Sequence, residues 1–111
     1  MITLLNLALF TSLSSAAALD AETTRVAYSN CLTEFTIAQL DEKVSAGAFK
    51  KAAPEVCSAE RAAMIAAIKK DELAFGSSAS ESESFAKEEA DGVLFSFTDG
   101  YAGYASSNTR P

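Results

Sequence analysis

Beyond residue 20 the chain repeats apolar positions with the period of an α-helix. The stretch 21–44 contains no glycine or proline, and its apolar residues share one helical face at Tyr28, Cys31, Leu32, Phe35 and Ala38. The same period returns from residue 55, and its apolar face carries Cys57, Met64, Ile68 and, just after the stretch 55–74, Phe75. The pattern therefore predicts two amphipathic helices, at about 21–44 and 55–74.

The connection between these helices contains residues that usually end a helix. Gly47 offers the backbone freedom that a helix C-cap needs, so we expect Ser45–Gly47 to end the first helix. A short helical turn is predicted at 48–53, interrupted by Pro54. That proline suits the first turn of the second helix, where its missing N–H would have no partner. The two helices should then run antiparallel as a hairpin.

The segment 81–105 fits two interpretations. The serine-rich stretch 76–84 indicates a linker that runs into the start of a helix, where Ser80 and Glu83 form an S-x-x-E capping box. As a helix, 81–105 has one broad apolar face formed by Phe85, Ala86, Ala90, Val93, Leu94, Phe97, Tyr101 and Tyr104. As a β-hairpin, strands at 93–98 and 101–105 would flank an Asp99-Gly100 turn. Because a lone two-stranded hairpin is marginally stable in water, we favour the helix and keep the hairpin at 93–105 as the alternative.

The N-terminal segment has the order of a secretory signal peptide. An apolar run that ends at Leu13 is followed by the small residues 14–18, and Ala16-Ala17-Ala18 fits the A-x-A cleavage rule. The run is too short and too often interrupted by polar residues for a transmembrane anchor, which needs roughly 20 apolar residues. We therefore expect a signal peptide at 1–18, one small domain at 19–111 without a membrane span, and a periplasmic or extracellular location.

Two cysteines in a small exported domain usually pair, so we expect a disulfide between Cys31 and Cys57. Their spacing differs from the C-x-x-C of catalytic redox pairs, which favours a structural role. The bond would join the first helix to the first turn of the second. The fold class predicted is all-α: a disulfide-tied antiparallel helical hairpin with a third, C-terminal helix.

Several kinds of chemistry lack their residues in this sequence. The chain has no histidine, which removes the commonest general base near neutral pH and the Ser-His and Cys-His nucleophile pairs. The glycines form no phosphate-binding loop, and the acidic residues form no calcium-loop motif. We therefore predict neither an enzyme nor a cofactor or metal site.

Charge and aromatic residues concentrate in the C-terminal third. The net charge is −6, and the segment 71–99 contains a single basic residue, Lys87, against eight acidic ones: Asp71, Glu72, Glu81, Glu83, Glu88, Glu89, Asp91 and Asp99. This balance argues against nucleic acid and anionic membranes as partners. The aromatic residues there supply either the core or a contact surface, and the candidates for partner contact are Phe95, Phe97, Tyr101 and Tyr104.

The function that these observations favour is non-catalytic binding or an envelope-associated role, with a basic exported protein as the partner. An inhibitor or chaperone-like factor that acts on another exported protein is the alternative, and an enzyme is the least favoured. The sequence does not indicate an oligomeric state.

One resemblance agrees with this interpretation. With Tyr28-x-x-Cys31-Leu32 on the first helix, then Phe49 and Cys57-x-x-Glu60-Arg61, the chain resembles small exported single-disulfide helical proteins of proteobacteria over roughly residues 25–104. Most such proteins have no assigned activity. The resemblance therefore implies a helical fold and an exported location, and it assigns no functional residue.

The first prediction concerns processing. Because Ala16 and Ala18 are the small pair placed directly after the apolar run, cleavage after Ala18 should leave Leu19 as the first residue of the exported protein. N-terminal sequencing of the secreted product tests this expectation. A membrane-bound product that retains Met1 would contradict it.

Overall fold

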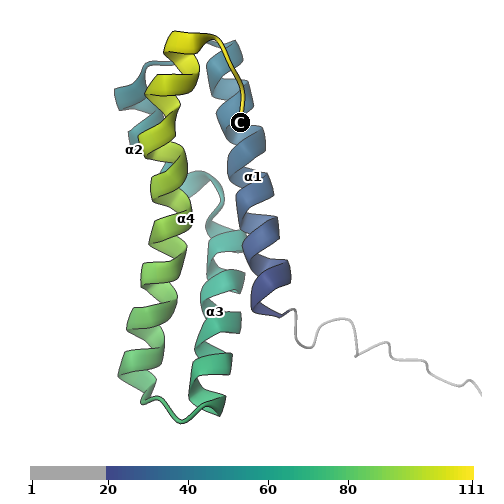
Figure 1. Cartoon of the computed structure of the whole chain (residues 1–111), viewed down its shortest axis with the longest axis vertical. Helices are drawn as coiled ribbons and strands as arrows, with labels where there is room; N and C mark the ends of the chain where they lie inside the picture. The colour runs from purple at the N-terminus through teal and green to yellow at the C-terminus, as the bar shows by residue number, and fades with distance from the viewer. Residues whose placement is uncertain (1–19) are drawn as a thin grey trace, which may run out of the picture.

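The computed structural model describes residues 20–111, so the predicted signal peptide at 1–18 and Leu19 lie outside the described part. Four helices follow one another in this part (Figure 1), with bounds α1 Ala21–Asp41, α2 Ala46–Val56, α3 Ser58–Ala74 and α4 Ala79–Ser107. Residues 20–111 contain no strand. The all-α class is confirmed, and the β-hairpin alternative at 93–105 is wrong, because this stretch lies inside α4.

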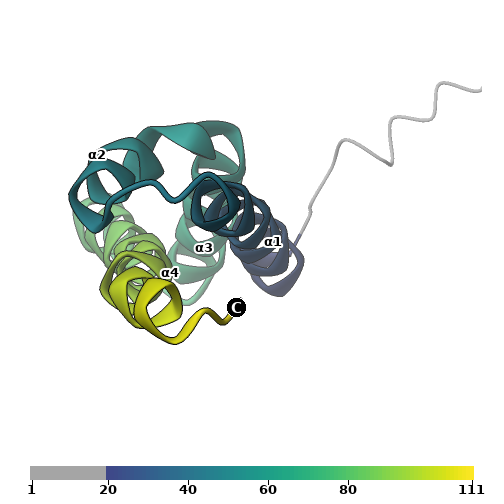
Figure 2. The same cartoon turned by 90° about the horizontal axis from the view of Figure 1, so that it is seen from above.

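The helices form a bundle of three columns, one of which is broken. α1 runs in one direction, α2 and α3 return in succession, and α4 runs back alongside both (Figures 1 and 2). The stretch 46–74 matches the 29 residues of α4, so that α2 covers one half of α4 and α3 covers the other. Towards the α3–α4 turn, α3 and α4 continue beyond the start of α1, and that end of the bundle consists of two helices (Figure 1).

The second column breaks at Cys57. Pro54 lies inside α2, where its missing N–H leaves one place in the helical hydrogen-bond ladder empty. Three residues later Cys57 leaves the helical conformation (φ −113°, ψ 40°), and α3 begins with the Arg61 N–H donating to the Cys57 carbonyl at 2.9 Å. The expected helix at 55–74 therefore begins at Ser58, and the expected turn at 48–53 is part of the longer α2.

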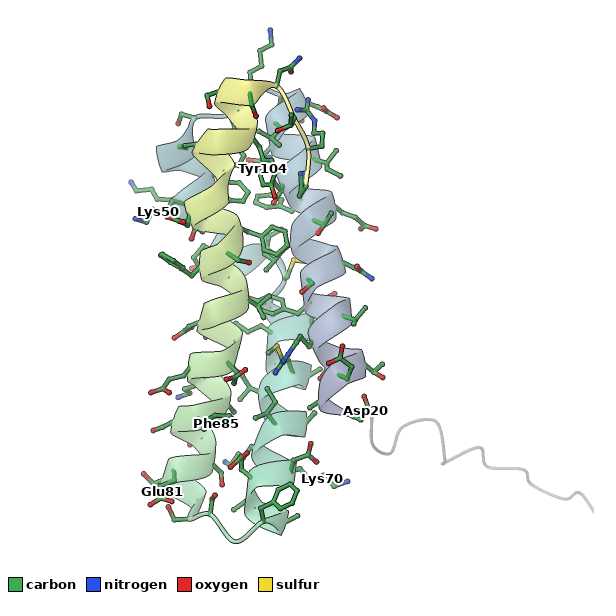
Figure 3. The ribbon with its side chains drawn as sticks, in the orientation of Figure 1. Asp20, Lys50, Lys70, Glu81, Phe85 and Tyr104 are labelled. Atoms are coloured by element: carbon green, nitrogen blue, oxygen red, sulfur yellow. A yellow bond between two sulfur atoms is a disulfide. The ribbon has the colours of Figure 1, made fainter. Side chains whose placement is uncertain are left out.

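The predicted disulfide between Cys31 and Cys57 is confirmed (Figure 3). The two Cα atoms are 6.1 Å apart, and the bond joins the middle of α1 to the junction of α2 and α3. Cys57 is itself buried, in a core cluster with Tyr28, Leu32, Met64, Ile68, Ala86 and Ala90. The covalent link therefore lies within the apolar core.

Buried residues on α1 and α4 recur mainly at intervals of four, along one row of each helix surface. On α1 they are Thr24, Tyr28, Leu32, Thr36 and Leu40. On α4 the first three are the small residues Ser82, Ala86 and Ala90, which let neighbouring helices approach closely. The buried Thr36 hydroxyl donates to the Leu32 carbonyl at 2.6 Å, so a polar side chain is tolerated in this core.

At the other end of the bundle the packing is aromatic. The rings of Phe49, from α2, and Tyr101, from α4, stack with centroids 4.1 Å apart, and Phe35 stacks on Phe49 at 5.6 Å. The Tyr101 hydroxyl donates to the Val44 carbonyl at 2.6 Å, which anchors the α1–α2 loop to α4. Burial raises the pKa of Tyr101.

Two predicted helix boundaries differ from the structure because other residues form the caps. α1 ends at Asp41, and Lys43 rather than Gly47 takes the left-handed conformation (φ 57°). The Lys43 and Val44 N–H groups then donate to the Leu40 and Gln39 carbonyls at 3.0 Å, the bonding pattern of a Schellman cap.

The start of α4 also differs from the prediction. Ser78 is its N-cap and accepts the Glu81 N–H at 3.1 Å, so the functional S-x-x-E pair is Ser78 and Glu81 rather than Ser80 and Glu83. The linker therefore ends at Ser78, and the rest of the serine-rich stretch 76–84 belongs to the first turns of α4. Ser80, which was expected to be the helix cap, is therefore a helical residue, whereas Ser82 and Ser84 lie inside the helix as expected.

The second prediction concerns the disulfide. Replacing both Cys31 and Cys57 with Ala should lower the free energy of unfolding by about 2–5 kcal/mol, because the unfolded chain loses a cross-link and the core loses two sulfur atoms. Denaturant unfolding followed by circular dichroism measures this change. Wild-type protein under reducing conditions is the matched control and should also be destabilised. Two reactive thiols in the denatured, non-reduced wild type would contradict the pairing.

Candidate partner-binding surface

The structure separates the four aromatic residues that the sequence grouped as partner contacts. The Phe95 side chain is 64% exposed, whereas Tyr101 is 0% exposed and belongs to the core. Phe97 and Tyr104 are partly buried and pack against the core clusters. The grouping is therefore corrected: Tyr101 stabilises the fold, and Phe95 is the member that faces solvent freely.

The side of α4 that faces away from the bundle carries a regular strip of its own. Alternating steps of four and three residues place seven exposed positions on one side of the helix. We call this set the outer strip, and its residues are Glu81, Phe85, Glu88, Gly92, Phe95, Asp99 and Ala102. The sequence analysis assigned Phe85 to the core face, but this side chain is 42% exposed. The sequence carries a signal for this strip: the alternating steps of four and three residues repeat every seven residues along the exposed side of the helix.

Each phenylalanine of the outer strip lies among carboxylates. Glu81 lies one helical turn before Phe85 (Figure 3). Glu88 lies one turn after Phe85 in the sequence of α4. Asp91 and Asp99 stand in the same relation to Phe95. Side chains three or four positions apart are neighbours on a helix surface, so each ring is bordered by negative charge at both ends.

Basic residues from other helices neutralise part of the charge of α4. Arg25 of α1 pairs with Glu89 at 3.1 Å, and Arg61 of α3 pairs with Asp91. Glu83 contacts two lysines, Lys69 of α3 at 3.9 Å and Lys87 at 3.3 Å. The count of eight acids against one base in 71–99 could not include these partners, because Arg25, Arg61 and Lys69 lie outside that segment. Within residues 20–111, the strip carboxylates Glu81, Glu88 and Asp99 form no ion pair.

Arg61 holds its charge at a partly buried position. Burial acts to lower the pKa of its guanidinium, but Tyr28 and Asp91 raise that pKa, and their effect prevails. Arg61 therefore remains protonated, and it fixes the Asp91 carboxylate one turn before Phe95. The Arg61–Asp91 ion pair therefore links α3 to the carboxylate that borders the outer strip beside Phe95.

The geometry offers little for metal or redox chemistry. The Cys31 and Cys57 sulfur atoms and a Glu60 oxygen lie within 4.8 Å of one another. Both sulfurs are consumed by the disulfide, so neither is a thiolate ligand in this state.

In the part of the chain that the structure describes, no helix is long and apolar enough to cross a bilayer.

Comparisons of the chain with protein-family models, curated proteins and solved structures found no match. The resemblance to small exported helical proteins of proteobacteria therefore remains a sequence-based expectation.

The third prediction separates the surface aromatic from the core aromatic. Phe95→Ala should change the free energy of unfolding by less than about 0.5 kcal/mol, because the side chain faces solvent. Tyr101→Ala should cost about 3–5 kcal/mol, because it removes a buried ring and its stacking on Phe49. Chemical denaturation of the two variants measures both changes. Similar losses for the two would contradict this placement.

Proposed function

We propose that the mature chain is an exported, non-catalytic binding protein that holds a basic partner protein against the outer strip of α4. The observation that carries the proposal is the pair of exposed phenylalanines, Phe85 and Phe95, set among exposed carboxylates on one side of a helix. Exposed aromatic side chains supply contact affinity, and the surrounding charge selects a partner of opposite sign.

The chemistry of the strip specifies how a partner would bind. An arginine or lysine of the partner can lie over a phenylalanine ring while its charge meets a neighbouring carboxylate, which combines a cation–π contact with an ion pair. Glu81, Glu88 and Asp99 are available for this role, because they form no ion pair within residues 20–111. A basic protein surface satisfies both halves of this arrangement.

The spacing of the two rings favours a macromolecule over a small ligand. Phe85 and Phe95 are ten residues apart on one helix, which separates them by about 15 Å along its axis. The small residues Gly92 and Ala102 of the strip leave room for a partner to approach the α4 backbone. A partner that contacts both rings must therefore extend over several turns of α4.

Two further features support an exported, non-catalytic role. A structural disulfide is typical of proteins in an oxidising compartment, which agrees with the signal-peptide pattern at 1–18. The strip lies along the solvent-facing side of α4, and its carboxylates are exposed to water. Enzymes place acid and base groups in clefts where burial tunes the pKa, and the strip has the opposite character.

The fourth prediction tests the strip in the native compartment. A photo-cross-linking amino acid at position 95 should give a covalent adduct with a basic protein, and the same group at position 75 should not. Phe75 is the matched control because its side chain is 86% exposed but lies outside the strip. Mass spectrometry identifies the adduct. Binding of the identified protein should weaken with added salt, and also in the Phe85→Ala/Phe95→Ala variant.

Three outcomes would contradict the proposal. Equal cross-linking from positions 75 and 95 would show that the strip has no selectivity. An adduct with a second copy of this chain would make the strip a self-association surface. A partner that binds equally well with and without the two phenylalanines would place its contact elsewhere on the protein.

A further inference from the structure

A pocket of about 340 Å³ opens at the end of the bundle where α1 finishes and α4 finishes. Its apolar wall consists of Leu40 from α1, Val44 from the α1–α2 loop, and Tyr101 and Ala105 from α4. Tyr101 is fixed there by its hydrogen bond to Val44, so this wall is preformed. The volume is near the lower limit of small-molecule sites, which run from about 300 to 1,000 Å³.

The polar side of the pocket is positively charged, although the protein as a whole is acidic. Lys43 and Arg110 line it together with one carboxylate, Asp41. Arg110 neutralises that carboxylate through two contacts to one oxygen, from Nη2 at 2.8 Å and Nε at 3.2 Å. Lys43 forms no ion pair within residues 20–111. The formal charges of the lining side chains therefore sum to +1, in contrast to the acidic outer strip.

The backbone adopts a costly conformation to place two of these lining residues. Lys43 (φ 57°) and Asn108 (φ 54°) are the two residues other than glycine with a positive φ in the described part of the chain, and both line this pocket. Asparagine tolerates that region, but lysine does not favour it, and glycine is the usual residue at such a cap. At the equivalent cap of α3 the chain does use a glycine, Gly76 (φ 96°). A lysine at this position gives up some stability, and the residue lines the pocket.

Arg110 also retains hydrogen-bonding capacity. A guanidinium has five N–H groups. Three are used, two by Asp41 and one by the Thr109 carbonyl at 3.1 Å, which leaves two. The contact with Asp41 holds the last residues of the chain beside α1, where Figure 1 shows the C-terminus, so the same ion pair keeps one wall of the pocket in place.

We infer that this pocket binds a small carboxylate with a short apolar body. The ligand carboxylate meets the Lys43 ammonium and the remaining N–H groups of Arg110, and its alkyl part packs on Leu40, Val44 and Ala105. A cationic ligand is disfavoured by the two basic side chains, and a neutral alcohol gains no ion pair. This site lies at the end of the bundle and is independent of the outer strip.

Hexanoate is a suitable probe, tested by NMR titration of the full mature protein. Saturable amide shifts at Lys43, Ala105 and Asn108 are expected, with a Kd of about 1 mM for a ligand of this size. Lys43→Gln should raise the Kd about fivefold, because one ion pair is lost. Lys50→Gln is the matched control: Lys50 is exposed on α2 and does not line the pocket, so the Kd should not change. Phe95→Ala should bind hexanoate as the wild type does.

Two control ligands test whether binding depends on the carboxylate of hexanoate. Hexanol should bind more weakly than hexanoate, and hexylammonium should give no saturable shift at these residues. The inference is overturned by an absence of saturable shifts with hexanoate, by an equal effect of Lys43→Gln and Lys50→Gln, or by equal binding of hexylammonium.

Discussion

The bond between Cys31 and Cys57 is the constraint around which this bundle is organised. It attaches the middle of α1 to the position where the returning chain changes from α2 to α3. The level at which α1 sits against the other helices is therefore set covalently. Two of the seven buried residues in the cluster around the bond, Ala86 and Ala90, have small side chains that bury little apolar area. The covalent link adds stability to a core in which these two positions contribute little.

The two ends of the bundle are held by different interactions. At one end, the stacked rings of Phe49 and Tyr101 and the hydrogen bond to Val44 join α2, α4 and the α1–α2 loop. Towards the other end, ion pairs from Arg25 and Arg61 cross to α4, and Ser82 and Ala86 let the helices approach closely. A sequence-based analysis recognises apolar faces, but it cannot show that one half of the core depends on aromatic stacking and the other on close helix contact.

The periodicity of the sequence predicted the helices well because most of their buried residues keep a regular spacing. It misplaced residues whose usual local preference was overridden by the packing of the whole bundle. Lys43 took the left-handed cap that Gly47 was expected to provide, and Pro54 was tolerated inside a helix that ends soon after it. Phe75 and Phe85 were assigned to core faces, because the sequence does not reveal that the neighbouring helices leave those positions uncovered. Phe75 lies at the turn between α3 and α4, beyond the start of α1.

The candidate sites were predicted only in part, for a related reason. Phe95, one of the residues proposed to contact a partner, is exposed, but Tyr101 is buried on a different face of the same helix. The partners of the acidic residues came from distant segments, as Arg25 and Glu89 show, and a count along the chain cannot detect them. The end pocket joins residues from 40–44 with residues from 101–110, which are adjacent only after the bundle has closed.

The unequal lengths of the columns also bear on how the molecule fluctuates. The segment of α3 and α4 that extends past α1 is a helical hairpin without a third helix to cover it, and Leu73 and Phe75 are exposed there. Regions with few buried apolar contacts open more often than the protein as a whole unfolds. We expect the backbone amides of this hairpin to exchange with solvent first, while those near the disulfide exchange only on global unfolding. The end of the bundle at the α3–α4 turn would then open locally while the rest of the domain stays folded.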